Sequence, residues 1–405
     1  MDNTDTESKG LVGDKMENAL FQLSDDWGNV KYHDELVVYG TGRIGRRVLP
    51  SLMKEFTIPF LIDTKDKGKK LFGLDVLAPE EVVERVKKNG LKILITTMKG
   101  AYNSISDSLK KQGLKENVDY CIFERFAQEW NLRWQNKCVL AKIDTVITTR
   151  CTLKCKNCNI FISHVTEPQD ISFNSLKDNF DVLFDSVDYI YEYTLLGGEP
   201  FVHEDIAEIL KYLEETYGNR IGRINIITNG TVVPNKDVLI LLNKYNVSVH
   251  ISDYTGTVPY SGKLDEVRRV LSKNEIEYYV IPNNTWKDIV YPNLNYISND
   301  PHNHMILCGH STHSVGNGRL YWCDPAYAAD CFMGFPSEED DYLDLKINKQ
   351  ENSKYDASIN IFNYFLGNIN ARGYMSLCSR CAGIGSDNDR IIKAGEQVSK
   401  FEQGL

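Results

Sequence analysis

The chain has 405 residues, of which 42% are hydrophobic and 25% charged, a composition typical of globular proteins with two or three domains. Its formal net charge of −10 argues against nucleic acid or an anionic membrane as partner, because such partners usually require a basic surface. There is no apolar run of about 18 residues, and the polar, acidic start "MDNTDTESKG" does not resemble a signal peptide. We therefore expect a cytoplasmic protein without a membrane span, in which the ten cysteines are better read as metal or redox groups than as disulfides.

The first part of the chain, residues 1–135, alternates strand-like and helix-like segments. Helices are expected after Gly45 and within 79–90 and 104–113, between strands at 35–40, 58–63 and 91–97. Strands that alternate with helices are typical of a parallel sheet with helical crossovers. The pattern predicts a Rossmann-like nucleotide-binding domain.

A glycine-rich turn follows the first of these strands. In "VVYGTGRIGRRV", Gly40, Gly42 and Gly45 have GxGxxG spacing, and Asp63 ends the next strand. Such a turn can bring backbone N–H groups and a helix N-terminus onto a phosphate, while the acidic residue suits a ribose hydroxyl. We predict a nucleotide or nucleotide-sugar site here, with helix packing alone as the alternative. The segment, with "LFGLDVLAPEE" downstream, also resembles Rossmann-like domains of bacterial sugar-modifying enzymes, which implies a nucleotide-linked sugar or glycan precursor as ligand.

The second part, residues 140–290, repeats the alternation of strands and helices. Strands are expected at 143–149, 189–196, 223–230, 247–252 and 277–282. A helix within 203–218 places Ile206, Ile209, Leu210 and Leu213 on one face and ends at Gly218. This predicts a second βα array, a full or partial barrel whose active site lies at the carboxyl ends of the strands.

Three cysteines stand directly after the first strand of this array, in "RCTLKCKNCNIF". Cys151, Cys155 and Cys158 have CX3CX2C spacing, so their thiolates can hold three irons of a cubane cluster and leave the fourth open. The triplet resembles the signature of the radical SAM superfamily. The resemblance implies a [4Fe-4S] cluster that binds S-adenosylmethionine; the family's usual aromatic residue before the third cysteine is here Asn157. A zinc site or buried structural cysteines are the alternative.

Later strands end in residues that also match the superfamily. Gly197, Gly198, Glu199 and Pro200 form the GGEP turn, which the resemblance associates with the amino group of S-adenosylmethionine. Weaker matches end the next two strands, where the family contacts the cofactor's ribose and carboxylate. These are Thr228, Asn229 and Ser252. Each of the three could equally be a helix cap or turn residue.

The last part, residues 300–405, is rich in cysteine, glycine and aromatic residues. Cys308, Cys323, Cys378 and Cys381 resemble the auxiliary-cluster pattern of the SPASM and twitch subfamilies, shortened so that it suits one cluster. This implies a second [4Fe-4S] cluster that relays an electron; structural zinc is the alternative. Cys331 could donate a hydrogen atom to a substrate radical, as in an epimerase, or be a buried hydrophobe. The histidines around Cys308 receive no role; they are His302, His304, His310 and His313.

We therefore predict an α/β protein with a Rossmann-like sheet, a radical SAM partial barrel and a small twitch-like iron–sulfur domain. The resemblance implies an enzyme that reductively cleaves S-adenosylmethionine to a 5′-deoxyadenosyl radical for hydrogen abstraction. We expect an oxidoreductase of carbohydrate biosynthesis that acts on a sugar, polyol or nucleotide-linked sugar and takes electrons from flavodoxin or ferredoxin. A peptide-modifying enzyme or an epimerase is the alternative within the superfamily, and an NAD-binding dehydrogenase with structural zinc is the alternative outside it.

Overall fold

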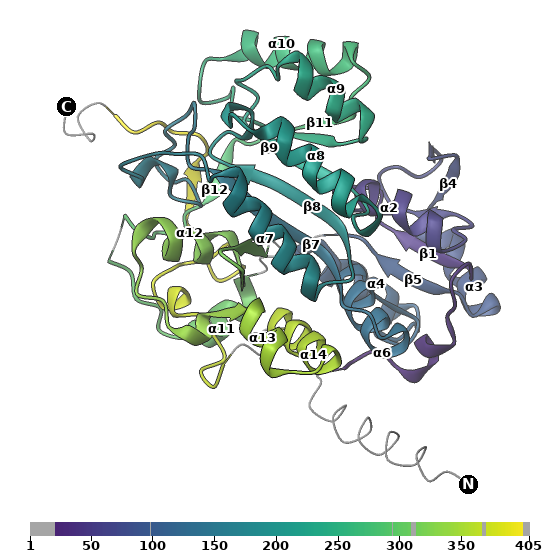
Figure 1. Cartoon of the computed structure of the whole chain (residues 1–405). Coiled ribbons are helices and arrows are strands. Elements are labelled where there is room, and N and C mark those ends of the chain that lie inside the picture. The colour runs from purple at the N-terminus through teal and green to yellow at the C-terminus, as the bar shows by residue number, and fades with distance from the viewer. Residues whose placement is uncertain (1–20, 98, 294, 309–312, 367–369, 400–405) are drawn as a thin grey trace. The chain divides into compact units, whose positions relative to one another are not determined.

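The computed structural model describes residues 21–97, 99–293, 295–308, 313–366 and 370–399 (Figure 1). The polar N-terminal stretch and His310 lie outside these ranges. The chain forms two compact units, each built from separate segments. The first comprises the residues up to Ala141, Ser186–Asp188 and Lys346–Asn368, and the second comprises the rest. The three-domain division drawn from the sequence stays a prediction; it differs from these units in where residues 346–368 and the C-terminal cysteines belong.

The first unit contains a six-stranded sheet in the order β3-β4-β2-β1-β5-β6. All neighbouring strands are parallel except β3 and β4. From β1 the chain adds strands on one side and then returns to add β5 on the other, which creates a switch point beside β1. The strands are β1 Leu36–Tyr39, β2 Leu61–Ile62, β3 Lys70–Leu71, β4 Leu74–Leu77, β5 Lys92–Ile95 and β6 Tyr120–Ile122.

Helices α2, α3 and α4 follow β1, β4 and β5 as the sequence predicts, although α2 begins earlier than expected, and β2, β3 and β4 follow one another without a helix. It starts at Arg43, so Gly45 lies in its first turn instead of before it. Short helices after β6 complete the N-terminal part of this unit. The helices are α2 Arg43–Glu55, α3 Pro79–Asn89, α4 Lys99–Lys111, α5 Phe123–Arg125, the π-helix η2 Phe126–Trp130 and α6 Asn131–Gln135, with the 3₁₀ turn η1 Asp25–Asn29 before β1.

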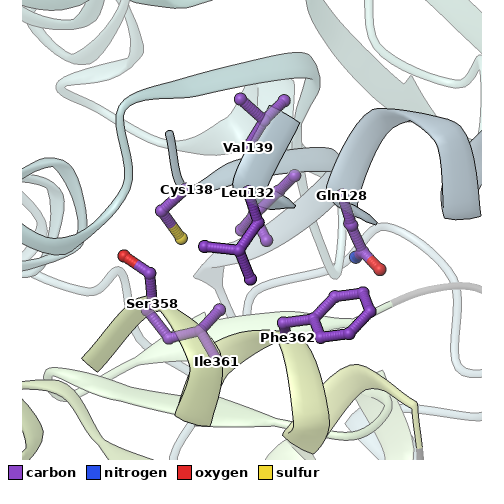
Figure 2. Close-up of a pocket in the computed structure, with 8 residues that line it drawn as sticks. Gln128, Leu132, Cys138, Val139, Ser358, Ile361 and Phe362 are labelled. Atoms are coloured by element: carbon purple, nitrogen blue, oxygen red, sulfur yellow. The ribbon is translucent and has the colours of Figure 1, made fainter. Parts of the chain in front are cut away.

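Two helices from late in the chain, α13 (Leu345–Glu351) and α14 (Lys354–Phe365), fall almost wholly within the first unit. Ile359 and Phe362 of α14 share a buried apolar cluster with Leu132 of α6. Figure 2 shows the small pocket between α6 and α14, which Cys138 and Ser358 also line. Its lining is mainly apolar, so we read it as a packing defect of this core.

The second unit contains an eight-stranded sheet in the order β11-β10-β9-β8-β7-β13-β14-β15. Strands β8 to β11 are parallel neighbours, and β7 begins the array next to β8. Strands β8 to β11 lie at the predicted positions, β7 begins four residues earlier than predicted, and β13 to β15 were not predicted. They are β7 Val139–Thr148, β8 Tyr189–Gly197, β9 Ile224–Thr228, β10 Ser248–Asp253, β11 Tyr278–Pro282, β13 Ser314–Gly316, β14 Arg319–Tyr321 and β15 Tyr342–Asp344.

One helix follows each of the first four strands, which gives the βα order of a partial barrel. Helices α7 and α8 lie along one face of the sheet (Figure 1), where Phe180 and Phe184 of α7 pack their rings against Tyr193 of β8. The helices are α7 Phe173–Ser186, α8 Ile206–Tyr217, α9 Lys236–Lys244, α10 Ser261–Lys273, α11 Pro301–Cys308 and α12 Asp324–Met333. The α/β class and the partial barrel predicted from the sequence are thus confirmed.

The carboxyl ends of the parallel strands share one edge of the second unit's sheet. At this edge β7 leads into the cysteine triplet, β8 into the GGEP turn and β9 into Asn229. The remaining elements are short. They are β12 Thr285–Lys287, β16 Ile391–Lys393, η3 Ile162–His164, η4 Pro200–Val202, η5 Gly218–Arg220, η6 Glu339–Asp341 and η7 Ser376–Ser379.

Candidate functional site

The loop after β7 carries the three cysteines of the predicted cluster signature. Cys151, Cys155 and Cys158 are partly buried and none forms a disulfide. The base of the loop is fixed to the chain before α7, because Thr149 N–H donates to Gln169 O at 2.9 Å and the Thr149 hydroxyl donates to the same oxygen. The strand therefore holds one end of the loop and leaves the thiols at its carboxyl edge.

The thiols of this loop influence one another. Burial raises the pKa of Cys151 to about 12, with smaller contributions from Glu199, Cys158 and Cys155. Burial, and then Cys158, raise the pKa of Cys155 to about 11, and a hydrogen bond from Gln397 opposes them. Each thiol therefore stays neutral unless a cation stabilises the buried thiolate. A bound metal ion provides this positive charge.

The GGEP turn packs directly against the cysteine loop. Gly198 N–H donates to Thr148 O and Glu199 N–H donates to Arg150 O, both at 2.9 Å. A side chain at either glycine would overlap this backbone, since a Cβ would lie 2.4 Å from Thr148 O at Gly197 and 2.1 Å from Arg150 O at Gly198. The two glycines are thus required by the close approach of the two strand ends.

Glu199 is completely buried and lies at the centre of a hydrogen-bond network. Its carboxylate accepts from the Thr228 hydroxyl at 2.8 Å, from Asn229 N–H at 2.9 Å and from Phe201 N–H at 3.1 Å. Burial raises the pKa of Glu199 to about 7, and these three donors oppose the shift. The next residue, Pro200, begins the short turn η4. Glu199 therefore joins the end of β8 to the end of β9.

Asn229 connects this network to the first cysteine. Its side-chain amide donates to Thr152 Oγ1 at 3.1 Å and lies 3.6 Å from Cys151 Sγ. Ser252, near the end of β10, is partly buried at the same edge, and the structure brings it close to Tyr254. Of the predicted residues, Glu199 and Asn229 contact the cysteine loop directly, and Thr228 contacts Glu199.

Asn157, which occupies the position that is usually aromatic in the superfamily, forms a polar contact. Its side-chain oxygen accepts from the Asn293 amide at 3.0 Å. An aromatic ring near the cysteine loop is that of Tyr254. Burial raises the pKa of its hydroxyl, and Cys155 raises this pKa further.

The four later cysteines come from three elements of the second unit and also gather. Cys308 ends α11, Cys323 is the N-cap of α12, and Cys378 and Cys381 flank the end of η7. Burial raises the pKa of Cys323, and the thiols of Cys378, Cys308 and Cys381 raise it further. Cys323 is thus close enough to the other three thiols to be influenced by them, and their assignment to one cluster stays a prediction.

A glycine allows this close gathering of thiols. At Gly383, which has φ of +64°, a Cβ would lie 3.0 Å from Cys308 Sγ and 2.5 Å from His304. His304 in turn contacts Asp387 through Nδ1 and Oδ2 at 2.8 Å. His304 thus has a partner beside the cysteines, which the sequence reasoning did not assign.

Cys331 lies apart from these four thiols in its contacts. Its sulfur is 3.8 Å from the Tyr321 hydroxyl and 3.5 Å from the Asn317 amide. Burial raises the pKa of Cys331 to about 11. Its role as hydrogen donor stays a prediction.

The three glycines of the glycine-rich turn in the first unit differ in their surroundings. Gly40 has φ of +117°, a Cβ at Gly45 would lie 1.9 Å from Gly40 O, and a Cβ at Gly42 would meet no atom within 4 Å. Asp63 accepts from Thr41 N–H at 2.8 Å, and from the N–H groups of Lys65 and Asp66. The Asp63 carboxylate is therefore engaged with the chain's own backbone instead of pointing freely to a ribose.

Two features of the second unit were not found from the sequence. Gln397, near the C-terminus, contacts Cys155, and no local pattern could have linked positions so far apart. Asp144 of β7 is fully buried and ion-paired to Lys142 at 3.2 Å. Burial raises the pKa of Asp144 to about 7; Lys142 opposes the shift, and Asp324 and Glu192 add to it. The sequence signal that could have revealed Asp144 is an acidic residue within a β-branched strand.

Among the residues that the structure describes, no three His, Cys, Asp or Glu side chains are grouped as ligands of a single metal ion. Ligands of one zinc ion lie within about 2.3 Å of it, whereas each thiolate of a cubane binds a separate iron. Within the same described ranges, no helix is long and apolar enough to cross a membrane.

Residues 145–257 match the family model of the radical SAM superfamily. Similar solved structures include anSMEcpe with bound AdoMet and Cp18Cys peptide, with 17% identity, a TM-score of 0.29, and coverage of 38% of this chain and 46% of that one. BtrN in complex with AdoMet and 2-DOIA has 14% identity, a TM-score of 0.38, and coverage of 60% and 93%. SuiB of Streptococcus suis bound to its precursor peptide SuiA has 16% identity, a TM-score of 0.23, and coverage of 38% and 42%.

A search of curated proteins found no match. The chain spans less than half of the anSMEcpe chain and of the SuiB chain in its complex with SuiA. The family match covers residues 145–257, which include the cysteine triplet and the GGEP turn, in agreement with the resemblance found in the sequence. Enzymes of this superfamily use a [4Fe-4S] cluster and S-adenosylmethionine as cofactors.

Proposed function

We propose that this chain is a radical SAM enzyme in which Cys151, Cys155 and Cys158 hold the catalytic [4Fe-4S] cluster. The observation that carries the proposal is the cysteine loop itself, packed against the GGEP turn at the carboxyl edge of a partial barrel. Three thiols and no fourth ligand in the loop fit a cluster with one open iron. When bound, the cluster and S-adenosylmethionine supply reductive cleavage of the cofactor and removal of a hydrogen atom from the substrate.

The chain's own residues would position the cofactors and exclude water. Gly197 and Gly198 let the strand end approach the cysteine loop, and we assign their backbone, with Glu199 and Pro200, to the amino group of S-adenosylmethionine. Thr228 and Asn229 hold Glu199 and face the loop. Ser252 would contact the ribose or carboxylate. These roles leave the substrate the remaining space inside the barrel.

We assign the second cysteine group to an auxiliary [4Fe-4S] cluster of twitch type. Its four thiols, Cys308, Cys323, Cys378 and Cys381, would close the coordination of the cluster, so it would accept an electron instead of binding substrate. Cysteines of both groups pack against the same apolar core cluster, which contains Val146 and Tyr321. An electron acceptor in this position supports an oxidation of the substrate.

The proposed substrate is a sugar or polyol, carried as a nucleotide-linked form by the first unit. Support comes from the open space at Gly42, the close packing at Gly45 and the switch point beside β1. A low-potential donor such as flavodoxin or ferredoxin would reduce the catalytic cluster. Peptide substrates are the second candidate, and a panel of nucleotide sugars and peptides assayed for substrate-dependent 5′-deoxyadenosine separates the two.

The class of reaction is tested with protein purified without oxygen and reduced with dithionite. Wild type should convert S-adenosylmethionine to 5′-deoxyadenosine, and the triple variant C151A/C155A/C158A should lose this conversion. The variant C378A/C381A should retain conversion without substrate but bind fewer irons per chain. Unchanged cleavage in the triple variant would refute the assignment, and full iron loading in C378A/C381A would refute the auxiliary cluster.

A further inference from the structure

The segment Gly395–Val398 lies along the cysteine loop and pairs with it through backbone hydrogen bonds. Lys156 N–H donates to Glu396 O at 2.7 Å, and Val398 N–H donates to Lys154 O at 2.8 Å. Between these bonds, Cys155 and Gln397 form an antiparallel bridge. The loop's central cysteine is therefore paired with a residue 242 positions later in the chain.

The Gln397 side chain uses both ends of its amide. Its oxygen accepts from Lys154 N–H at 2.7 Å, while its nitrogen donates to Gly395 O at 2.7 Å and lies 3.5 Å from Cys155 Sγ. The neighbouring acceptor and donor fix which end of the amide is which. The N–H end therefore faces the sulfur.

The segment reaches this position through a defined path. β16 pairs antiparallel with β12, and Ala394 N–H donates to Asn284 O at 3.0 Å. Gly395, with φ of +72°, then passes Tyr254, whose side-chain atoms would lie 3.0 to 3.3 Å from a Cβ at this position. The glycine is needed both for its backbone conformation and for this close passage.

We propose that Gly395–Val398 is part of the catalytic cluster site, with Gln397 as a positioning residue that fixes the cysteine loop and donates a hydrogen bond to the Cys155 thiolate. This inference rests on the proposed function, because it takes Cys155 as a cluster ligand. A hydrogen bond to a ligating sulfur withdraws negative charge and stabilises the reduced, more negative cluster. Gln397 thus raises the reduction potential of the catalytic cluster.

The first test measures the geometry without reference to the cluster's redox state. Hydrogen exchange of the full chain is followed by mass spectrometry on a peptide that contains Lys154 to Lys156. Gln397→Met, which keeps the length of the side chain but has no N–H, should speed exchange in this peptide. Gln169→Met is the control, because Gln169 is exposed and holds the loop through its backbone. Equal exchange in wild type and Gln397→Met would overturn the positioning role.

The second test is a redox titration of the catalytic cluster by electron paramagnetic resonance. Gln397→Met should shift its oxidised-to-reduced equilibrium about tenfold toward the oxidised form, which is about 59 mV to lower potential for one electron. Gln397→Asn, whose amide is too short to reach the sulfur, should shift the reduction potential in the same direction. This variant serves as the substitute if Gln397→Met does not fold. The signal of the auxiliary cluster should not move in either variant.

The outcomes separate this inference from the proposed function. If wild type shows no signal that responds to S-adenosylmethionine, the proposed function fails. If wild type shows that signal but the potentials of Gln397→Met and Gln397→Asn equal those of wild type and Gln169→Met, the role of Gln397 fails alone.

Discussion

Glu199 is the residue on which the carboxyl edge of the barrel most depends. Its buried carboxylate accepts from the backbone N–H groups of Phe201 and Asn229 and from the Thr228 hydroxyl. Leaving a buried donor unsatisfied costs about 1–3 kcal/mol. The GGEP turn therefore depends on its acid for structure as well as for any contact with a cofactor.

Replacement of Glu199 by alanine should lower the free energy of unfolding of the second unit by about 2–4 kcal/mol, because several donors lose their acceptor at once. The measurement is urea-induced unfolding. Glu204→Ala is the control, since the Glu204 side chain is 81% exposed and its ion pair with Arg150 lies at the surface; its effect should stay within about 0.5 kcal/mol. Equal effects of the two variants would contradict this account of Glu199.

Asp144 makes stability depend on pH. Burial raises its pKa from the ordinary 3.8 to about 7, so between these values the folded chain binds more protons than the unfolded chain. Stability contributed by this group is therefore present at low pH and is lost as pH rises from about 4 to about 7. Asp144→Asn, which cannot ionise, should raise Tm relative to wild type more at pH 8 than at pH 5. A Tm difference that is independent of pH would show that Asp144 is not protonated in the folded chain.

At the scale of elements, glycines decide how closely helices and strand ends approach. Gly45 in the first turn of α2 packs on Gly40 O, whereas Gly42, the N-cap of the same helix, faces open space. Within this motif, Gly45 is therefore expected to serve packing and Gly42 to serve binding.

Gly45→Ala should destabilise the first unit by about 2 kcal/mol or more, because its methyl group would overlap backbone. Gly42→Ala should change stability by less than about 1 kcal/mol but weaken binding of ADP or UDP, since its methyl group would fill the space a phosphate would use. Thermal unfolding and isothermal titration calorimetry with each nucleotide measure the two effects. Unaltered nucleotide affinity in Gly42→Ala, or no binding by wild type, would contradict a nucleotide site at this turn.

The elements with strong local signals could be predicted from the sequence, and those set by distant contacts could not. The apolar period of 206–217 and the β-branched run before Cys151 predicted α8 and β7, because burial on one face or on both leaves a pattern. The place of helix α14 could not be predicted from the sequence, because α14 belongs to the first unit while the chain on either side of Lys346–Asn368 belongs to the second. Strands β13 to β15 extend the barrel sheet by pairing that no local pattern specifies.

The candidate site divides in the same way. The cysteine spacing and the GGEP turn are local, so the residues that belong together could be named from the sequence. The partners of these residues are not local: Thr228 meets Glu199 from the next strand, and Gln397 meets Cys155 from the C-terminal segment. Asp63 shows the opposite case, because its sequence position suggests a ribose ligand while its carboxylate accepts from the N–H groups of Thr41, in the glycine-rich turn, and of Lys65.

In the whole molecule, the two groups of cysteines would have separate functions. The triplet after β7 would serve radical formation, and the four later thiols would serve electron transfer. Both groups belong to the second unit, and the first unit carries the glycine-rich turn. The metal content of the chain is therefore its most informative property.

The most direct test measures iron and zinc per chain after anaerobic purification, with the electron paramagnetic resonance spectrum of the reduced protein before and after S-adenosylmethionine is added. The account predicts about eight irons, as two four-iron clusters require, and one signal that shifts when the cofactor binds. About four irons with one zinc would keep the radical chemistry but remove the electron acceptor, and would favour a redox-neutral reaction over oxidation. Zinc without iron, and no signal that responds to S-adenosylmethionine, would contradict the central claim.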